Sequence, residues 1–256
     1  MTTENRWREQ YLNTGSYEHE IARGNVRGAY PYSAYGKLTT SGAVTDVLVR
    51  DDDGTTLVVP QGVQLSLVST SANDAAAGTG ARTVVVEYLN GDLDYSFEMV
   101  ALNGTTPVLT LATDVRWVQA VHVATAGSGG KAAGDITATN GGVTYLKILV
   151  GERTTHNSFT RVPRQRRLFV TQMYAGASSG SSASRVKVEA VSTQINGLDQ
   201  SETGLFYKVA GIALQDGSAT LALTSPFPVN AGQIFGFVAT SDKAATITTG
   251  YMGWIE

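Results

Sequence analysis

From about residue 44 to the end of the chain, apolar residues either alternate with polar ones or form short runs. Short runs of this kind, separated by turns rich in Gly, Asn, Asp and Ser, are typical of the strands of a β-sandwich or barrel. In the first half the pattern predicts strands at residues 44–50, 56–59, 63–68, 83–88, 95–102, 107–111, 115–124, 134–139 and 144–150. In the second half it predicts strands at residues 167–175, 185–192, 206–214, 219–223, 233–240 and 245–254.

The run at 115–124 shows the alternation most clearly. In a regular strand, successive side chains point to opposite faces of the sheet. We therefore expect Trp117, Gln119 and Val121 to share one face, and Val118 and Ala120 to share the other.

The first 37 residues do not follow this pattern. Residues 3–12 and 17–24 could each form a short helix, with Thr3 as an N-cap and Gly24 just past the second helix. Residues 24–36 read as extended chain, because Gly and Pro interrupt them. Aromatic side chains on such an arm need a surface to bury them, either the chain's own sheets or a neighbouring subunit. The interface candidates are Trp7, Tyr11, Tyr17, Tyr30, Tyr32 and Tyr35.

Residues 151–163 are polar and break the strand pattern, which places a domain boundary there. The sequence thus predicts an all-β chain made of two tandem antiparallel β-sandwiches, jelly-roll-like, preceded by an N-terminal arm. The predicted boundaries are 1–37 for the arm, 38–150 for the first sandwich and 151–256 for the second. Domains of this size are common.

Composition narrows the function more than the fold. Charged residues make up 16% of the 256 residues, against roughly 25% in typical soluble domains, and the net charge is −3. An acidic balance argues against nucleic acid as a partner. The chain has no cysteine, which excludes disulfides and thiolate metal sites. No apolar run approaches the length of a membrane span, and the polar N-terminus argues against a signal peptide.

Motifs for chemistry are weak. Asp51, Asp52 and Asp53 precede Gly54, but position 12 of an EF-hand loop would fall on Gly62 rather than Glu. The plainer interpretation is a hairpin turn with solvated charges. The alternative is a loose Ca²⁺ site in the same turn.

The remaining chemical motifs are no stronger. His19, His122 and His156 lack zinc spacing, and His122 on a strand reads as a satisfied or surface histidine. The loops at 78–82 and 127–134 resemble phosphate loops only superficially, since Ala132 and a strand follow Lys131. We predict no enzyme activity, catalytic residue, metal or cofactor.

A basic patch is the one charged cluster that stands out. Arg161, Arg164, Arg166 and Arg167 lie within seven residues of sequence. Arginine forks can clamp carboxylate or phosphate groups, so the cluster could bind an acidic neighbour, an anionic glycan or nucleic acid. The alternative is a basic turn before a strand, and one cluster on an acidic chain supports nucleic-acid binding only thinly.

Several stretches resemble one family. STSANDAAAGTGARTVVVEYLNG, then ALNGTTPV and ATAGSGGKAAGDITAT, are similar to virion proteins of tailed bacteriophages, as are YEHEIARGNVRG near the start and PFPVNAGQIFGF and GWIE at the end. The resemblance covers nearly the whole chain, and RVPRQRR departs from the Pro-x-Gly turn that the family often has. It implies a non-enzymatic structural protein of the virion, assembled in the host cytoplasm.

That resemblance leads to two functional hypotheses. In the first, the arm attaches the chain to other capsid or tail proteins and the chain forms a symmetric homo-oligomer. In the alternative, the chain is a module that binds host-surface glycan through Tyr174, Tyr207, Tyr251 and Trp254 of the second half. The sequence does not choose between capsid decoration and a tail component.

Overall fold

The computed structural model describes residues 17–51, 56–179, 184–195 and 198–256. Within them, regular structure is almost entirely β-strand, and every strand pair is antiparallel. The prediction of an all-β, antiparallel chain is confirmed. Among the described residues no helix is long and apolar enough to cross a membrane.

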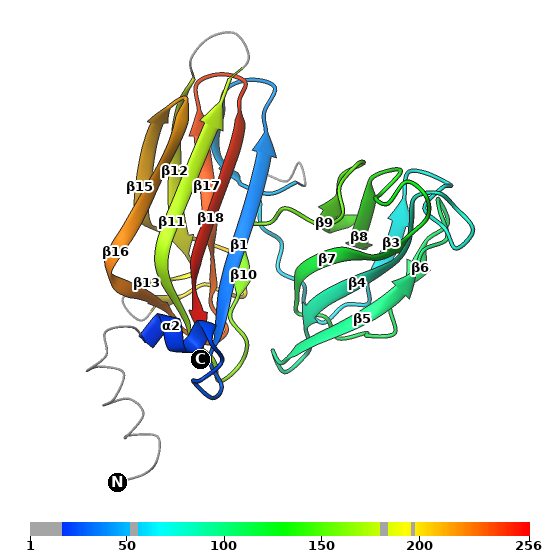
Figure 1. Cartoon of the computed structure of the whole chain (residues 1–256), viewed down its shortest axis with the longest axis horizontal. Coiled ribbons are helices and arrows are strands. Elements are labelled where there is room, and N and C mark those ends of the chain that lie inside the picture. Colours follow the sequence, from blue (N-terminus) through cyan, green and yellow to red (C-terminus); the bar gives the residue numbers. More distant parts are fainter. Residues whose placement is uncertain (1–16, 52–55, 180–183, 196–197) are drawn as a thin grey trace.

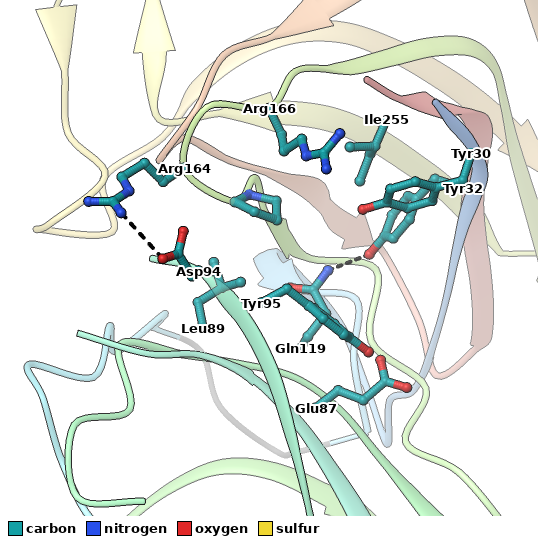
Figure 2. Close-up of a pocket in the computed structure, with 11 residues that line it drawn as sticks. Tyr30, Tyr32, Glu87, Leu89, Asp94, Tyr95, Gln119, Arg164, Arg166 and Ile255 are labelled. Carbon is teal, nitrogen blue, oxygen red and sulfur yellow. Dashed lines mark hydrogen bonds and ion pairs between the residues drawn. The ribbon is translucent and has the colours of Figure 1, made fainter. Parts of the chain in front are cut away.

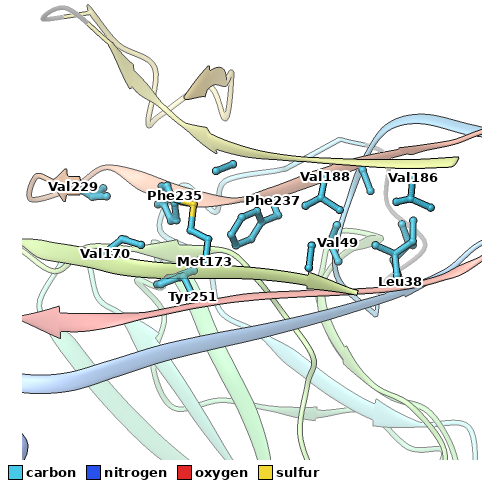
Figure 3. Close-up of a cluster of buried hydrophobic side chains, with 14 of the residues drawn as sticks. Leu38, Val49, Val170, Met173, Val186, Val188, Val229, Phe235, Phe237 and Tyr251 are labelled. Carbon is cyan, nitrogen blue, oxygen red and sulfur yellow. The ribbon is translucent and has the colours of Figure 1, made fainter. Parts of the chain in front are cut away.

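Two sheets face each other across one apolar core; we call them the main sheet pair (Figures 1 and 3). The first has the order β1 (Tyr30–Thr39), β18 (Thr246–Ile255), β11 (Leu168–Ser178), β16 (Gly217–Val229). The second has the order β10 (Thr160–Arg161), β17 (Ile234–Ser241), β12 (Arg185–Ser192), β15 (Tyr207–Gln215), with β2 (Val44–Leu48) also paired to β17. Val170, Met173, Phe235, Phe237 and Tyr251 fill the space between the sheets and are at most 2% exposed.

A smaller group of strands, which we call the inserted sheet pair, lies between β2 and β10 in sequence. One of its sheets has the order β6 (Val108–Leu109), β3 (Ser66–Ser69), β8 (Ile136–Asn140), β9 (Val143–Ile148). The other has the order β5 (Tyr95–Ala101), β4 (Ala81–Leu89), β7 (Trp117–Ala126). Leu67, Val84, Val86, Ile136 and Ile148 belong to its separate core. A short hairpin, β13 (Gln194–Ile195) with β14 (Leu198–Asp199), completes the described strands.

The strand pairing does not follow the predicted boundaries at residues 37 and 150. β1 begins inside the predicted arm and pairs with β18 along its whole length, from Tyr30 opposite Ile255 to Thr39 opposite Thr246. β2, placed in the first predicted sandwich, pairs with β17. Strands from both ends of the chain therefore build the main sheet pair, and the other group is inserted rather than tandem. Strand patterns do not encode partners this distant in sequence.

Most predicted strands form close to their predicted positions, with a few exceptions. Residues 56–59 form no strand; instead, Leu57 and Val59 are buried in a third apolar cluster. Residues 107–111 contribute only the two-residue β6. The predicted strand at 219–223 extends to the longer β16.

The third apolar cluster joins the two sheet pairs. Leu89 and Trp117 of the inserted pair pack there with Phe159 and with Ile234 of the main pair, and these four residues are at most 3% exposed. Burying a large apolar side chain contributes roughly 1.5–3 kcal/mol. Because several such residues meet, this cluster holds the inserted pair beside β1 and β10 (Figure 1).

The helix predicted at 17–24 is confirmed as α2 (Tyr17–Ala22). Gly24 adopts a φ of 75°, the left-handed conformation that ends helices, and Asn25 N donates to Glu20 O. Ile21 is buried, while the Tyr17 hydroxyl donates to Glu256 Oε2 over 2.7 Å. The helix is thereby fixed to the C-terminal end of β18. The helix predicted at residues 3–12 lies outside the described residues.

Candidate binding cleft

A pocket of about 590 Å³ opens where the main and inserted sheet pairs meet (Figure 2). This volume lies within the range of small-molecule sites. Its walls come from both sheet pairs and from the turn before β11. The lining residues are Tyr30, Tyr32, Glu87, Leu89, Asp94, Tyr95, Gln119, Pro163, Arg164, Arg166 and Ile255.

A β-bulge in β7 places Gln119 at this cleft. β4 pairs Glu87 with Ala120 but Tyr88 with Val118, so Gln119 is left without a direct partner in the ladder. The bulge puts Val118 and Val121 into the same core. The predicted alternation, with Gln119 and Val121 on one face, is therefore wrong. Gln119 donates from Nε2 to the Tyr32 hydroxyl on the main sheet pair.

The tyrosines of β1 form one wall. The Tyr32 hydroxyl accepts from Gln119 and lies 2.9 Å from Thr160 Oγ1, to which it can donate. Burial raises the pKa of Tyr32 to about 12, and burial also raises the pKa of Tyr30. Both hydroxyls are therefore protonated near neutral pH. Tyr30 remains 41% exposed, so part of its ring faces the open cleft.

The opposite wall carries Glu87 and Tyr95 on adjacent strands β4 and β5. His122 Nε2 lies 3.4 Å from Glu87 Oε1 and lowers the pKa of this carboxyl group, which keeps it ionised at neutral pH. Burial, followed by the nearby Glu87 charge, raises the pKa of Tyr95. The ring of Tyr95 is 50% exposed. His122 also contacts Thr154 Oγ1 through Nδ1 at 2.7 Å, in keeping with the prediction of a satisfied histidine.

Two of the four predicted basic-patch residues reach this cleft. Arg164 Nη2 donates to Asp94 Oδ2 at 3.3 Å, and its backbone N–H donates to Leu93 O at 2.9 Å. Arg166 Nη1 donates to Gly28 O at 2.6 Å. These contacts tie the turn before β11 to the inserted pair on one side and to the chain before β1 on the other.

The other two arginines lie elsewhere. Arg161 is 1% exposed; it donates to Gly232 O at 2.9 Å and Arg116 O at 3.2 Å, and pairs with Glu202. Arg167 is exposed, and its backbone pairs with Glu256. The four side chains therefore do not share one surface. The folded chain separates them because Arg161 lies on strand β10 and the others follow it in the turn.

The aromatic interface candidates are likewise divided. Trp7 and Tyr11 lie outside the described residues. Tyr17 packs edge-on against Trp254 at a ring distance of 5.7 Å. Tyr35 is 41% exposed and contacts the ring of His156. Among the described members of the set, Tyr30 and Tyr32 line the cleft together with Arg164 and Arg166.

The acidic turn is only partly described. Asp51 is buried, and its Oδ2 accepts from the His156 backbone N–H at 3.0 Å and lies 2.8 Å from His156 Nδ1. This contact is an ion pair when His156 is protonated. Asp52 and Asp53 lie outside the described residues. Within the described ranges, His, Asp and Glu side chains form no group of three that could hold a metal ion.

The aromatic residues proposed for glycan contact in the second half are mostly interior. Tyr251 is 0% exposed and Trp254 is 8% exposed, while Tyr174 and Tyr207 are half-buried. Tyr251 packs against Phe235 and Phe237 in the main core. The two most buried rings are therefore not available to a ligand.

The loops at residues 69–82 and 127–134 meet at one buried carboxylate, Asp74. Its Oδ1 accepts from Ala81 N at 2.6 Å and Ala133 N at 2.9 Å. Its Oδ2 accepts from Ser69 Oγ at 2.6 Å and Gly134 N at 2.9 Å. Asp74 is 0% exposed and thus fixes two loops that are distant in sequence. These loops have a structural role.

Sequence reasoning missed Glu87, Asp94, Tyr95 and Gln119 as cleft residues. The local signal was a polar Gln among the apolar residues of 117–121. β5 also inverts the expected pattern: Tyr95, Phe97 and Met99 are 50–69% exposed, although alternation alone would bury large apolar side chains.

No protein-family model and no curated protein sequence matches the chain. Among solved structures, it shows a faint likeness to two structures of infectious bursal disease virus, of the Gt and Gx strains. The sequence identities are 7% and 9%, and each alignment covers 89% of this chain and 72% of the other, with a TM-score of 0.18. Similarity at this level does not establish a shared fold, so neither structure bears on the function of the chain.

Proposed function

We propose that this chain is a non-enzymatic structural protein of a tailed-bacteriophage virion, acting through contacts with other virion proteins. The observation that carries the proposal is the residue-level resemblance of residues 69–82, 102–108 and 124–139 to such proteins. Their part in the fold supports it, because Asp74 holds these loops in a fixed arrangement. A rigid scaffold suits a protein whose work is assembly.

We further propose that the two sheet pairs are two sandwich domains, one a jelly roll and the other inserted into it. The pairing of β1 with β18, and of β2 with β17, supports this. Nested pairing of the two ends of a chain over two facing sheets is the arrangement of a jelly roll, a fold found in viral capsid and lectin domains. The fold by itself does not establish the function.

Attachment and oligomerisation remain parts of the proposal. Because residues from Tyr30 onward belong to β1, an attachment arm is confined to the chain before this strand.

The edge strand β16 (Gly217–Val229) supports a symmetric oligomer. Its first eight residues, 217–224, contain neither a charged residue nor a proline, its side chains are largely exposed, and among the described strands only β11 pairs with it. Uncharged edges are prone to pair with other chains.

Particle association tests this function. Virions purified from cells that express the full chain from its phage genome should contain it, as shown by mass spectrometry and antibody labelling of intact particles. Chain found only in the particle-free fraction would refute the proposal. To test the arm, the double variant Trp7→Ser and Tyr11→Ser should lose incorporation while keeping its melting temperature. The control variant Phe97→Ser, at a 69% exposed ring far from the arm in sequence, should incorporate normally.

A further inference from the structure

The cleft between the sheet pairs combines partly exposed aromatic rings with an apolar floor. Tyr30 of β1 and Tyr95 of β5 come from different sheet pairs and are 41% and 50% exposed. Leu89 and Ile255 also line the pocket (Figure 2), although they are only 0% and 1% exposed, and Pro163 is a further apolar lining residue. Rings that combine an apolar face with a hydroxyl suit ligands that are apolar on one side and hydroxylated at the edge.

One polar atom in this cleft lacks a partner. Gln119 donates through Nε2 to Tyr32, but its Oε1 is buried and has no hydrogen-bond partner among the described residues. A buried acceptor left unpaired costs free energy, so a ligand that donates a hydrogen bond to it would gain stability. The tyrosine hydroxyls and the Glu87 carboxylate add further donors and acceptors around the same space.

The charges at the cleft balance. Arg164 and Arg166 are matched by Glu87 and Asp94, which gives a formal net charge of zero. Arg164 is already paired with Asp94, and Arg166 donates to a backbone carbonyl. An anionic ligand would have to displace these contacts and approach Glu87, whereas a neutral ligand meets no repulsion.

We propose that this cleft binds a neutral saccharide, with sugar rings against Tyr30 and Tyr95 and a sugar hydroxyl donating to Gln119 Oε1. This site goes beyond the structural role proposed above and differs from the second-half residues considered for glycan contact. Because it spans both sheet pairs, binding also requires the attachment held by the third apolar cluster.

The test uses the full chain on an array of neutral, sialylated and sulfated oligosaccharides, followed by calorimetric titration with the neutral oligosaccharide that binds best. Tyr95→Ala should weaken binding about tenfold through loss of the ring contact. Gln119→Met, which removes the acceptor at similar size, should weaken binding about fivefold. The matched control Phe97→Ala removes a more exposed ring on the same face of β5, outside the cleft lining, and should bind like the wild type.

Absence of neutral-saccharide binding up to about 10 mM, a limit that corresponds to a very weak complex, would overturn the proposal. Binding of acidic saccharides alone would overturn it as well. Equal losses in Tyr95→Ala and Phe97→Ala would place binding on the outer face of β5 rather than in the cleft, and so refute the site. Variant melting temperatures within about 2 °C of the wild type show that the losses do not come from unfolding. None of these results changes particle association, so the structural proposal stands or falls separately.

Discussion

Replacing Asp74 tests whether one buried carboxylate organises the loops of the inserted sheet pair. Asp74→Ala would leave four donors without their acceptor: Ser69 Oγ and the backbone N–H groups of Ala81, Ala133 and Gly134. A hydrogen bond to a charged group contributes about 1.5 kcal/mol or more to stability. Losing all four would therefore cost roughly 6 kcal/mol. Water entering the vacated space recovers part of this. We expect a loss of about 4 kcal/mol in the free energy of unfolding of the inserted pair.

Asp74→Asn is a sharper variant because it keeps the size of the side chain. Each carboxylate oxygen accepts from at least one backbone N–H. Either orientation of the amide therefore places an NH₂ group against a backbone donor. We expect a loss of about 2 kcal/mol, smaller than for Ala because the remaining oxygen still accepts.

Urea denaturation with fluorescence and circular dichroism measures these losses, and hydrogen–deuterium exchange locates them. Exchange should rise in residues 69–82 and 127–135 and stay unchanged in β11 and β18 of the main sheet pair. The control Asp92→Ala removes an exposed turn carboxylate that lies 3.6 Å from Arg164, and it should cost less than about 0.5 kcal/mol. If Asp74→Ala costs less than about 1 kcal/mol, or raises exchange equally throughout the chain, the reasoning fails.

Two further predictions concern the joints between the sheet pairs. Contact with the Asp51 carboxylate raises the pKa of His156 above its usual value, so this pair stabilises the fold fully below about pH 6.5 and less as pH rises through the folded-state pKa. The urea midpoint should fall between about pH 6 and pH 8.5 in the wild type and change less in Asp51→Asn; equal slopes would contradict this. Arg161→Met should cost about 3 kcal/mol by calorimetry because it removes a buried donor from the partly buried carbonyls of Gly232 and Arg116. Glu202→Gln, at a half-exposed partner, should cost under about 1 kcal/mol, and similar losses for both variants would argue against burial as the cause.

Strand formation was largely determined by the sequence. Short runs of β-branched and aromatic residues between Gly, Asn and Asp turns favour strands whatever their partners are, because the preference is local. The strand at 185–192 has the predicted bounds, and Gly24 ends α2 as its conformational freedom predicts. The proposed role in a virion also rests on the sequence alone, on loops whose small residues and Asp74 fit one compact arrangement.

The tertiary structure decided which strands pair, which side chains face the core and where the cleft lies. Period-two alternation does not indicate which strand lies next in the sheet. The pairing of β1 with β18 joins residues more than 200 positions apart in sequence, so it could not be predicted from the pattern. The bulge that turns Gln119 toward Tyr32 is a mismatch between two strands and exists only once β4 and β7 pair. The same holds for the arginines: adjacency in sequence suggested one basic patch, but strand β10 carries Arg161 into the interior while the following turn carries Arg164 and Arg166 to the cleft.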